Sequence, residues 1–103
     1  MSEATSPGTA DAGIGALRRG LEITNKRGLH ARAAAKFVRT AGQFDSVVRV
    51  GFKGQEVSGL SIMGLMMLSA GIGSEIELVC SGRQAIEAMA ALSALIEGKF
   101  GED

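Results

Sequence analysis

Two hydrophobic periods alternate along this chain and restrict the folds that it can adopt. Residues 17–24 place apolar side chains at three of the four alternate positions on one side, which is typical of a half-buried strand. Residues 30–41 place them at i, i+3, i+4 and i+7, which is typical of an amphipathic helix. The apolar positions are Leu17, Leu21 and Ile23 in the strand and Ala34, Phe37, Val38 and Ala41 in the helix. A sheet whose strands have one apolar face needs helices to cover that face.

The remaining segments continue this alternation. Strand patterns recur at residues 46–52, 55–58 and 75–80. Helical patterns recur at residues 62–68 and 83–97. Because only Lys53-Gly54 separates the second and third strands, we expect these strands to form a hairpin. The order β-α-β-β-α-β-α predicts an α+β open-faced β-sandwich, in which three helices cover one face of a four-stranded antiparallel sheet.

The same patterns predict the buried side chains and the ends of the helices. The expected inward-facing residues are Val48, Val50 and Phe52, then Ile76, Leu78 and Cys80, and in the last helix Ala85, Ala88, Met89, Leu92 and Ile96. Val79 is expected on the opposite face of its strand. Gly42 stands at the C′ position of the first helix, and Gly98 ends the last one. The acidic chain end, Glu102-Asp103, is expected to fray.

Composition and charge argue against several classes of protein. Hydrophobic residues make up 46% of the 103 residues, enough for one small domain, and 11 Lys and Arg balance 11 Asp and Glu. A chain without a basic excess is not a typical nucleic-acid or membrane-surface binder. The apolar stretches are too short to span a bilayer, and no secretory signal is visible. These absences favour a cytoplasmic protein.

Two further features concern the start of the chain and its single cysteine. Residues 1–16 are rich in Ser, Thr, Gly and Ala and are expected to form a disordered tail before a domain at residues 17–103. Cys80 is the only cysteine, so no internal disulfide is possible. With one cysteine and one histidine, the chain offers no metal cluster, and neither a metal site nor a cofactor is expected. Cys80 lies on the apolar side of its strand and is expected in the core.

The only histidine, His30, stands where the first helix is expected to begin, in the segment Gly28-Leu29-His30-Ala31-Arg32-Ala33. Backbone N–H groups at a helix start are unpaired and carry a partial positive charge, so they bind anions. Arg32 adds a planar fork of donors suited to phosphate. The same positive field disfavours the imidazolium form and should keep the ring nucleophilic. His30 is therefore a candidate phosphoryl acceptor, the alternative being a helix-start histidine with a local hydrogen bond.

Two motifs together resemble a known family. The segment from Gly28 to Ala34 is similar to the active-site signature of HPr, the histidine-containing phosphocarrier of the bacterial phosphotransferase system. Ser61, 31 residues after His30, begins a segment that resembles the regulatory-serine helix of the same family. The element order and the glycine-rich residues 70–75 also match. The resemblance covers about residues 17–101.

The resemblance implies an HPr fold and a set of roles. His30 would accept a phosphoryl group on Nδ1 from phospho-enzyme I, which phosphoenolpyruvate charges, and pass it to an EIIA-type protein. Arg32 would contact the phosphate, and Ser61 would be modified by an HPr kinase/phosphorylase where that enzyme exists. The chain departs from many members at Ala33, where they have proline. Alanine returns one N–H group to the first turn, so we expect a modest change in rigidity.

The helix that follows Ser61 has more apolar residues than a short helix can bury. Leu60, Met63 and Met67 are candidates for a docking face toward enzyme I and the acceptors. Ser61 also has the chemistry of an ordinary N-cap. Because the chain has no phosphoenolpyruvate site and no visible catalytic base, we expect a carrier that depends on partner enzymes. A monomer is the default expectation.

Two alternatives remain open at the level of the sequence. The first is a mainly regulatory HPr-like module of the nitrogen-type phosphotransferase branch, with no direct role in sugar uptake. The histidine-free catabolite-repression paralogue is a more extreme case, which the retained His30 argues against. The second is a nucleic-acid-binding α+β domain, which the neutral charge and the absence of Trp and Tyr argue against.

Overall fold

A computed structural model describes residues 15–102. The elements in chain order are β1 (Leu17–Glu22), α2 (Ala31–Ala41), β2 (Val47–Phe52), β3 (Gln55–Ser58), α3 (Ile62–Met67), β4 (Glu75–Ser81), α4 (Ala85–Glu97) and a 3₁₀ turn, η1 (Lys99–Gly101). Every expected strand and helix is present, with ends that differ by at most two residues. Of the expected tail, residues 1–14 lie outside the described part, so the tail and the domain boundary stay predictions.

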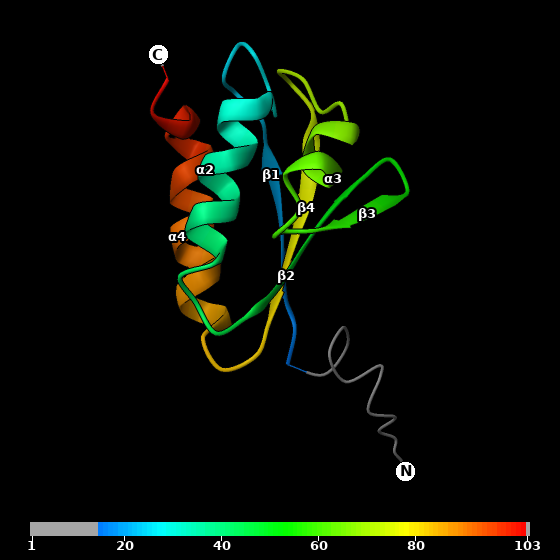
Figure 1. Cartoon of the computed structure of the whole chain (residues 1–103). Coiled ribbons are helices and arrows are strands. Elements are labelled where there is room, and N and C mark those ends of the chain that lie inside the picture. Colours follow the sequence, from blue (N-terminus) through cyan, green and yellow to red (C-terminus); the bar gives the residue numbers. More distant parts are fainter. Residues whose placement is uncertain (1–14, 103) are drawn as a thin grey trace.

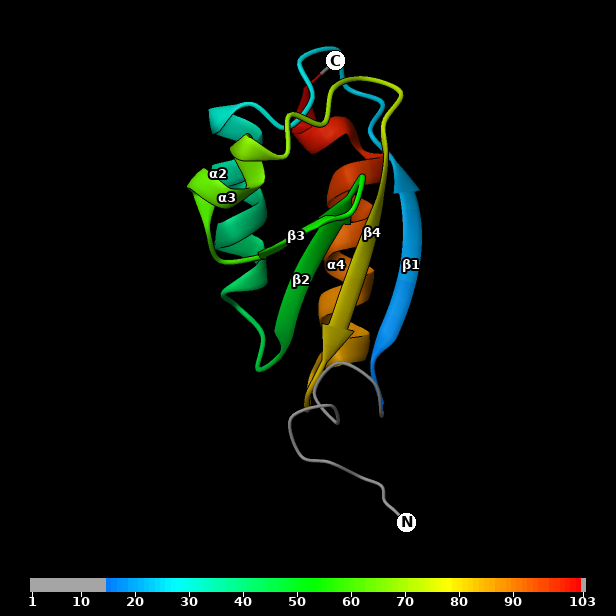
Figure 2. The ribbon, with the colours of Figure 1, turned by 90° about the vertical axis from the view of Figure 1, so that its right-hand side faces the viewer.

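The four strands form one antiparallel sheet in the order β1-β4-β2-β3. The helices α2 and α4 run along one face of this sheet, and the short helix α3 contacts α2 and β3 (Figure 1 and Figure 2). The predicted α+β open-faced sandwich with three helices is therefore confirmed. None of the helices within residues 15–102 combines the length and the apolar character that crossing a membrane requires.

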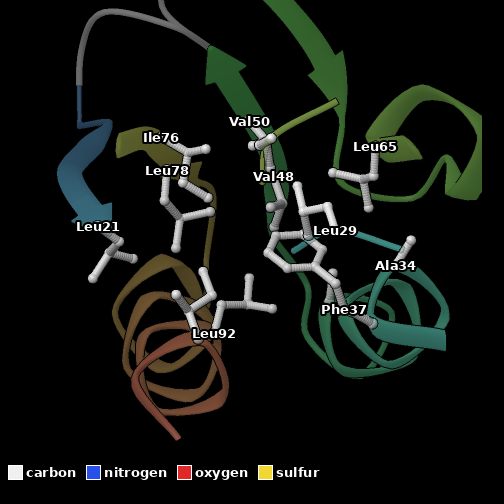
Figure 3. Close-up of a cluster of buried hydrophobic side chains, with 14 of the residues drawn as sticks. Leu21, Leu29, Ala34, Phe37, Val48, Val50, Leu65, Ile76, Leu78 and Leu92 are labelled. Carbon is white, nitrogen blue, oxygen red and sulfur yellow. The ribbon is translucent and has the colours of Figure 1, made fainter. Parts of the chain in front are cut away.

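The core lies between the sheet and the helices. Figure 3 shows Phe37 of α2 pointing toward Val48, and Leu92 of α4 lying near Leu78. The fully buried large side chains include Phe37, Phe100, Ile23, Leu65, Ile76, Leu78, Leu92 and Ile96. Burying one such side chain stabilises the fold by roughly 1.5–3 kcal/mol. All five residues of the predicted α4 stripe are buried, as is Cys80.

Two sequence-based expectations, those for Leu17 and Gly42, were wrong in detail, and Val79 lies on its expected face but is buried there. Leu17 is 37% exposed, because it is the first residue of an edge strand. Val79 is buried although it lies on the helix-free face; it pairs with Arg18 and Arg49 of the flanking strands, whose apolar stems can cover it. Gly42 ends α2 in a right-handed conformation, with φ −69°, and so does not form a left-handed C′ cap.

One glycine fixes the approach to His30. Gly28 has φ +65°, a conformation that favours glycine. A Cβ atom at Gly28 would lie 2.5 Å from the carbonyl oxygen of Ala70 and 2.7 Å from the Cα of Gly71. The next residue, Leu29, donates its N–H to the same Ala70 oxygen over 3.0 Å. Two loops, residues 25–28 and 68–71, are thus pressed together immediately before α2.

We expect the substitution Gly28→Ala to lower the free energy of unfolding by about 1–3 kcal/mol through backbone strain alone. The clash of the new Cβ atom with Ala70 should lower it further. Gly71→Ala is the matched control in the facing loop, because nothing lies within 4 Å of its Cβ position and it has no positive φ. It should change the stability by no more than about 0.5 kcal/mol. Denaturant unfolding measures both variants. A Gly28→Ala protein as stable as the wild type would contradict the close approach.

Candidate functional site

His30 lies at the N-cap of α2, where the sequence placed it. Its backbone is extended, with φ −75° and ψ 177°, and its carbonyl accepts the N–H of Ala34 over 2.8 Å. Its side chain makes no capping hydrogen bond, so the ring does not occupy the free N–H groups of the first turn. The side chain is 15% exposed. An imidazole thus stands, partly accessible, beside the positive end of an 11-residue helix.

The ring has a partner that sequence reasoning missed. Its Nε2 atom lies 2.5 Å from Oε2 of Glu102. The other carboxylate oxygen, Oε1, accepts a hydrogen bond of 3.1 Å from Nδ2 of Asn25, which also donates to the Gly28 carbonyl over 2.9 Å. Asn25 is fully buried. The expectation that Glu102 frays was wrong, whereas Asp103 lies outside the described residues.

The chain end reaches His30 because its last turn is anchored. Phe100 is fully buried, and its carbonyl oxygen accepts a hydrogen bond of 2.7 Å from Nζ of Lys36 on α2. The three residues of η1 have positive φ angles of 58°, 56° and 77°. Two of them, Lys99 and Phe100, are not glycine and are therefore strained. The signal in the sequence was Phe100 itself, a large apolar residue in an otherwise polar chain end.

The contacts of Glu102 change its ionisation. The hydrogen bond from His30 lowers the pKa of the Glu102 carboxyl, and the Asn25 hydrogen bond and the electrostatic interactions with His30 and Arg27 lower it further, against desolvation. Glu102 is therefore ionised at neutral pH. The sequence predicted only a positive field around His30, and the structure adds this carboxylate.

Cations gather beside this pair. A hollow of about 410 Å³ is lined by Lys26, Arg27, Arg32, Lys36, Gly101 and Glu102. Arg32 lies exposed in the first turn of α2 and pairs with no carboxylate of residues 15–102. Lys26 and Arg27, from the loop before His30, line the same hollow. The arrangement suits an incoming anion, because four positive side chains face one carboxylate.

Ser61 is the N-cap of α3, as predicted. Its Oγ accepts a hydrogen bond of 2.9 Å from the N–H of Gly64. The three docking candidates are exposed, with Leu60 at 58%, Met63 at 67% and Met67 at 71%. The helix α3 contacts α2, the helix that begins after His30 (Figure 2).

The remaining reactive groups do not form a further site. Among residues 15–102, no three His, Cys, Asp or Glu side chains are arranged to hold a metal ion. Burial raises the pKa of the Cys80 thiol to about 11, so this thiol stays protonated in the core.

Comparison with known proteins identifies the family. A family model described as the PTS HPr component phosphorylation site matches residues 17–98. The phosphocarrier protein HPr of Neisseria meningitidis serogroup A is 55% identical over 86 residues, which are 84% of this chain and 97% of that protein. The phosphocarrier protein NPr of Shewanella violacea is 41% identical over 86 residues, covering 84% of this chain and 94% of that one.

The solved structures agree with the sequence relatives. The crystal structure of HPr-C-His from Thermoanaerobacter tengcongensis has a TM-score of 0.81 and 45% identity, and the match covers 84% of this chain and 98% of that chain. Since the family model spans most of the chain and the relatives match over nearly their whole length, the chain belongs to the HPr family of phosphocarrier proteins of the phosphotransferase system.

Proposed function

We propose that this protein accepts a phosphoenolpyruvate-derived phosphoryl group from phospho-enzyme I on Nδ1 of His30 and passes it to an EIIA-type protein. The observation that carries this proposal is the position of the imidazole at the N-terminus of α2, with Arg32 exposed two residues further along, in the first turn. Free N–H groups and a guanidinium stabilise the charge on a phosphoryl group in transfer. Membership of the family supports the carrier role itself.

The chemistry divides between the carrier and its partners. The lone pair of Nδ1 forms a new N–P bond, while the bond between phosphorus and the donor's nitrogen breaks and leaves its electron pair on the donor. The carrier supplies the nucleophile and the anion-binding groups, and the partner enzymes supply the rest of each site. The protein is therefore a phosphoryl carrier with a phosphohistidine intermediate and not a self-contained enzyme.

Docking must be brief, because the phosphoryl group moves on to a second protein. We assign it to the exposed side chains of Leu60, Met63 and Met67, with the cationic hollow drawing in an acidic partner face. Flexible methionine side chains adapt to more than one partner. We place this exchange in the cytoplasm. The expected monomeric state stays a prediction.

A mainly regulatory role in the nitrogen-type branch is the second candidate. The similarity to an NPr of Shewanella violacea favours it. In that role the phosphorylation state of His30 would report on metabolism to other proteins. Phosphoryl transfer to a nitrogen-branch EIIA protein, but not to a sugar-branch EIIA protein, would distinguish this role from sugar uptake.

The carrier role predicts the outcome of incubation with phosphoenolpyruvate, magnesium and enzyme I, followed by intact-mass measurement. The wild type should gain one acid-labile phosphate, and His30→Ala should gain none. Arg32→Ala should accept phosphate about 10²-fold more slowly, because one donor to the transferring group is lost. Arg39→Ala removes an exposed arginine from the last turn of the same helix and should react at the wild-type rate. No gain by the wild type, with enzyme I active on another carrier, would refute the proposal.

Regulation at Ser61 is a separate part of the proposal, which supposes an HPr kinase/phosphorylase as a further partner. Because the Ser61 side chain already caps α3, a negative group there should keep the helix and add charge to the docking face. The regulation would then act through partner binding.

Two substitutions of Ser61 distinguish the effect of a negative charge from the effect of helix capping. Ser61→Asp and Ser61→Asn both retain an N-cap acceptor, so the free energy of unfolding should stay within about 0.5 kcal/mol of the wild type in each. Ser61→Asp should slow phosphoryl transfer from enzyme I about tenfold through repulsion by an acidic partner face. Ser61→Asn should transfer at the wild-type rate. Equal transfer rates for the two variants would rule out a charge effect at this position.

A further inference from the structure

The imidazole of His30 is held by a group that can only accept a hydrogen bond. Glu102 is ionised at neutral pH, and an ionised carboxylate has no proton to donate. The contact of 2.5 Å between Nε2 and Oε2 therefore places the proton of the neutral ring on Nε2. The other ring nitrogen, Nδ1, then carries the lone pair.

Asn25 determines how Glu102 is presented to the ring. Its Nδ2 group donates to both the Gly28 carbonyl and Oε1 of Glu102. Reversing the Asn25 amide would oppose oxygen to oxygen at both contacts, so these partners fix its orientation. The site at position 102 is thus enclosed between two donors, Nδ2 of Asn25 and Nε2–H of His30. The side chain at position 102 must therefore accept a hydrogen bond from each of these donors.

The backbone of the turn before Glu102 also indicates that the position of this side chain matters. The turn that carries Glu102 contains two strained non-glycine residues, Lys99 and Phe100, and it is anchored by a buried ring and by the hydrogen bond from Lys36. Strain that persists beside a reactive side chain indicates that the position reached by the turn matters. This turn places the Glu102 carboxylate in contact with His30.

We infer that Glu102 is a positioning residue, which keeps the His30 proton on Nε2 and so reserves Nδ1 for phosphoryl transfer. The inference rests on the proposed function. When Nδ1 forms its bond to phosphorus and the donor's N–P bond breaks, the Nε2 proton stays in place and the ring becomes positively charged. The contact with the carboxylate then strengthens, as it does for a carboxylate that orients a catalytic histidine.

Glutamine at position 102 tests the inference more sharply than alanine. In Glu102→Gln, Nδ2 of Asn25 should select the amide oxygen, which turns the amide NH₂ group toward His30. The ring must then accept at Nε2, and its proton moves to Nδ1, the atom that has to attack. Glu102→Ala removes the contact without imposing this tautomer.

The measurements are ring ¹⁵N NMR of His30 at neutral pH and the rate of phosphoryl transfer from enzyme I. The wild type should show the Nε2–H tautomer and Glu102→Gln the Nδ1–H tautomer. Glu102→Gln should accept phosphate about 10-fold to 100-fold more slowly than the wild type, and more slowly than Glu102→Ala. In a Glu102→Gln protein that also carries Asn25→Ala, the amide is free to turn, and the rate should rise toward that of Glu102→Ala.

Glu97→Gln is the matched control, because Glu97 is a second carboxylate near the chain end, and it pairs with Arg19 of β1 and not with His30. It should leave both the tautomer and the rate unchanged. A wild-type ring in the Nδ1–H form, or a Glu102→Gln protein that reacts as fast as the wild type, would overturn the inference. Failure of the wild type to accept phosphate at all would instead overturn the proposed function, which separates the two ideas.

Discussion

The burial of one apolar sheet face under α2 and α4 is the constraint on which the site depends. Because α2 must lie along the sheet to cover it, its N-terminus falls at one end of the molecule, where the loop before His30, the loop after α3 and the chain end also meet (Figure 1). The close contact between Gly28 and Ala70 fixes two of these loops against each other. His30 is thus positioned by core packing as well as by its own contacts.

Local charge, and not net charge, characterises this end of the molecule. The whole chain is formally neutral, yet four cations line one hollow beside His30. Among the residues that line it, Glu102 is the only acid, and both of its oxygens are already engaged by donors. The hollow can therefore attract an anionic group, while the carboxylate is directed at the far nitrogen of the imidazole. In the proposed phosphoryl transfer, attraction of the anionic group and orientation of the imidazole therefore fall to different side chains.

The helix α3 has both buried and exposed apolar side chains. Leu65 and Leu68 are buried and tie this segment to the core, whereas Met63 and Met67 are exposed. Ser61 caps the helix with its hydroxyl group, so its side chain stands at the edge of the exposed apolar face. A charge added there would change what the face attracts while the helix keeps its cap.

The sequence by itself determined the order of the elements, the α4 stripe, the N-cap at Ser61 and the position of His30 at a helix start, because each of these depends on a local period or on a few neighbouring residues. Only the tertiary structure decided that Glu102 contacts His30, since 72 residues separate them and the contact requires the α4 packing and the turn at Phe100. It also decided the burial of Val79, which lies between Arg18 and Arg49 of the two neighbouring strands. Periodicity describes a single element, whereas these contacts depend on how separate elements pack.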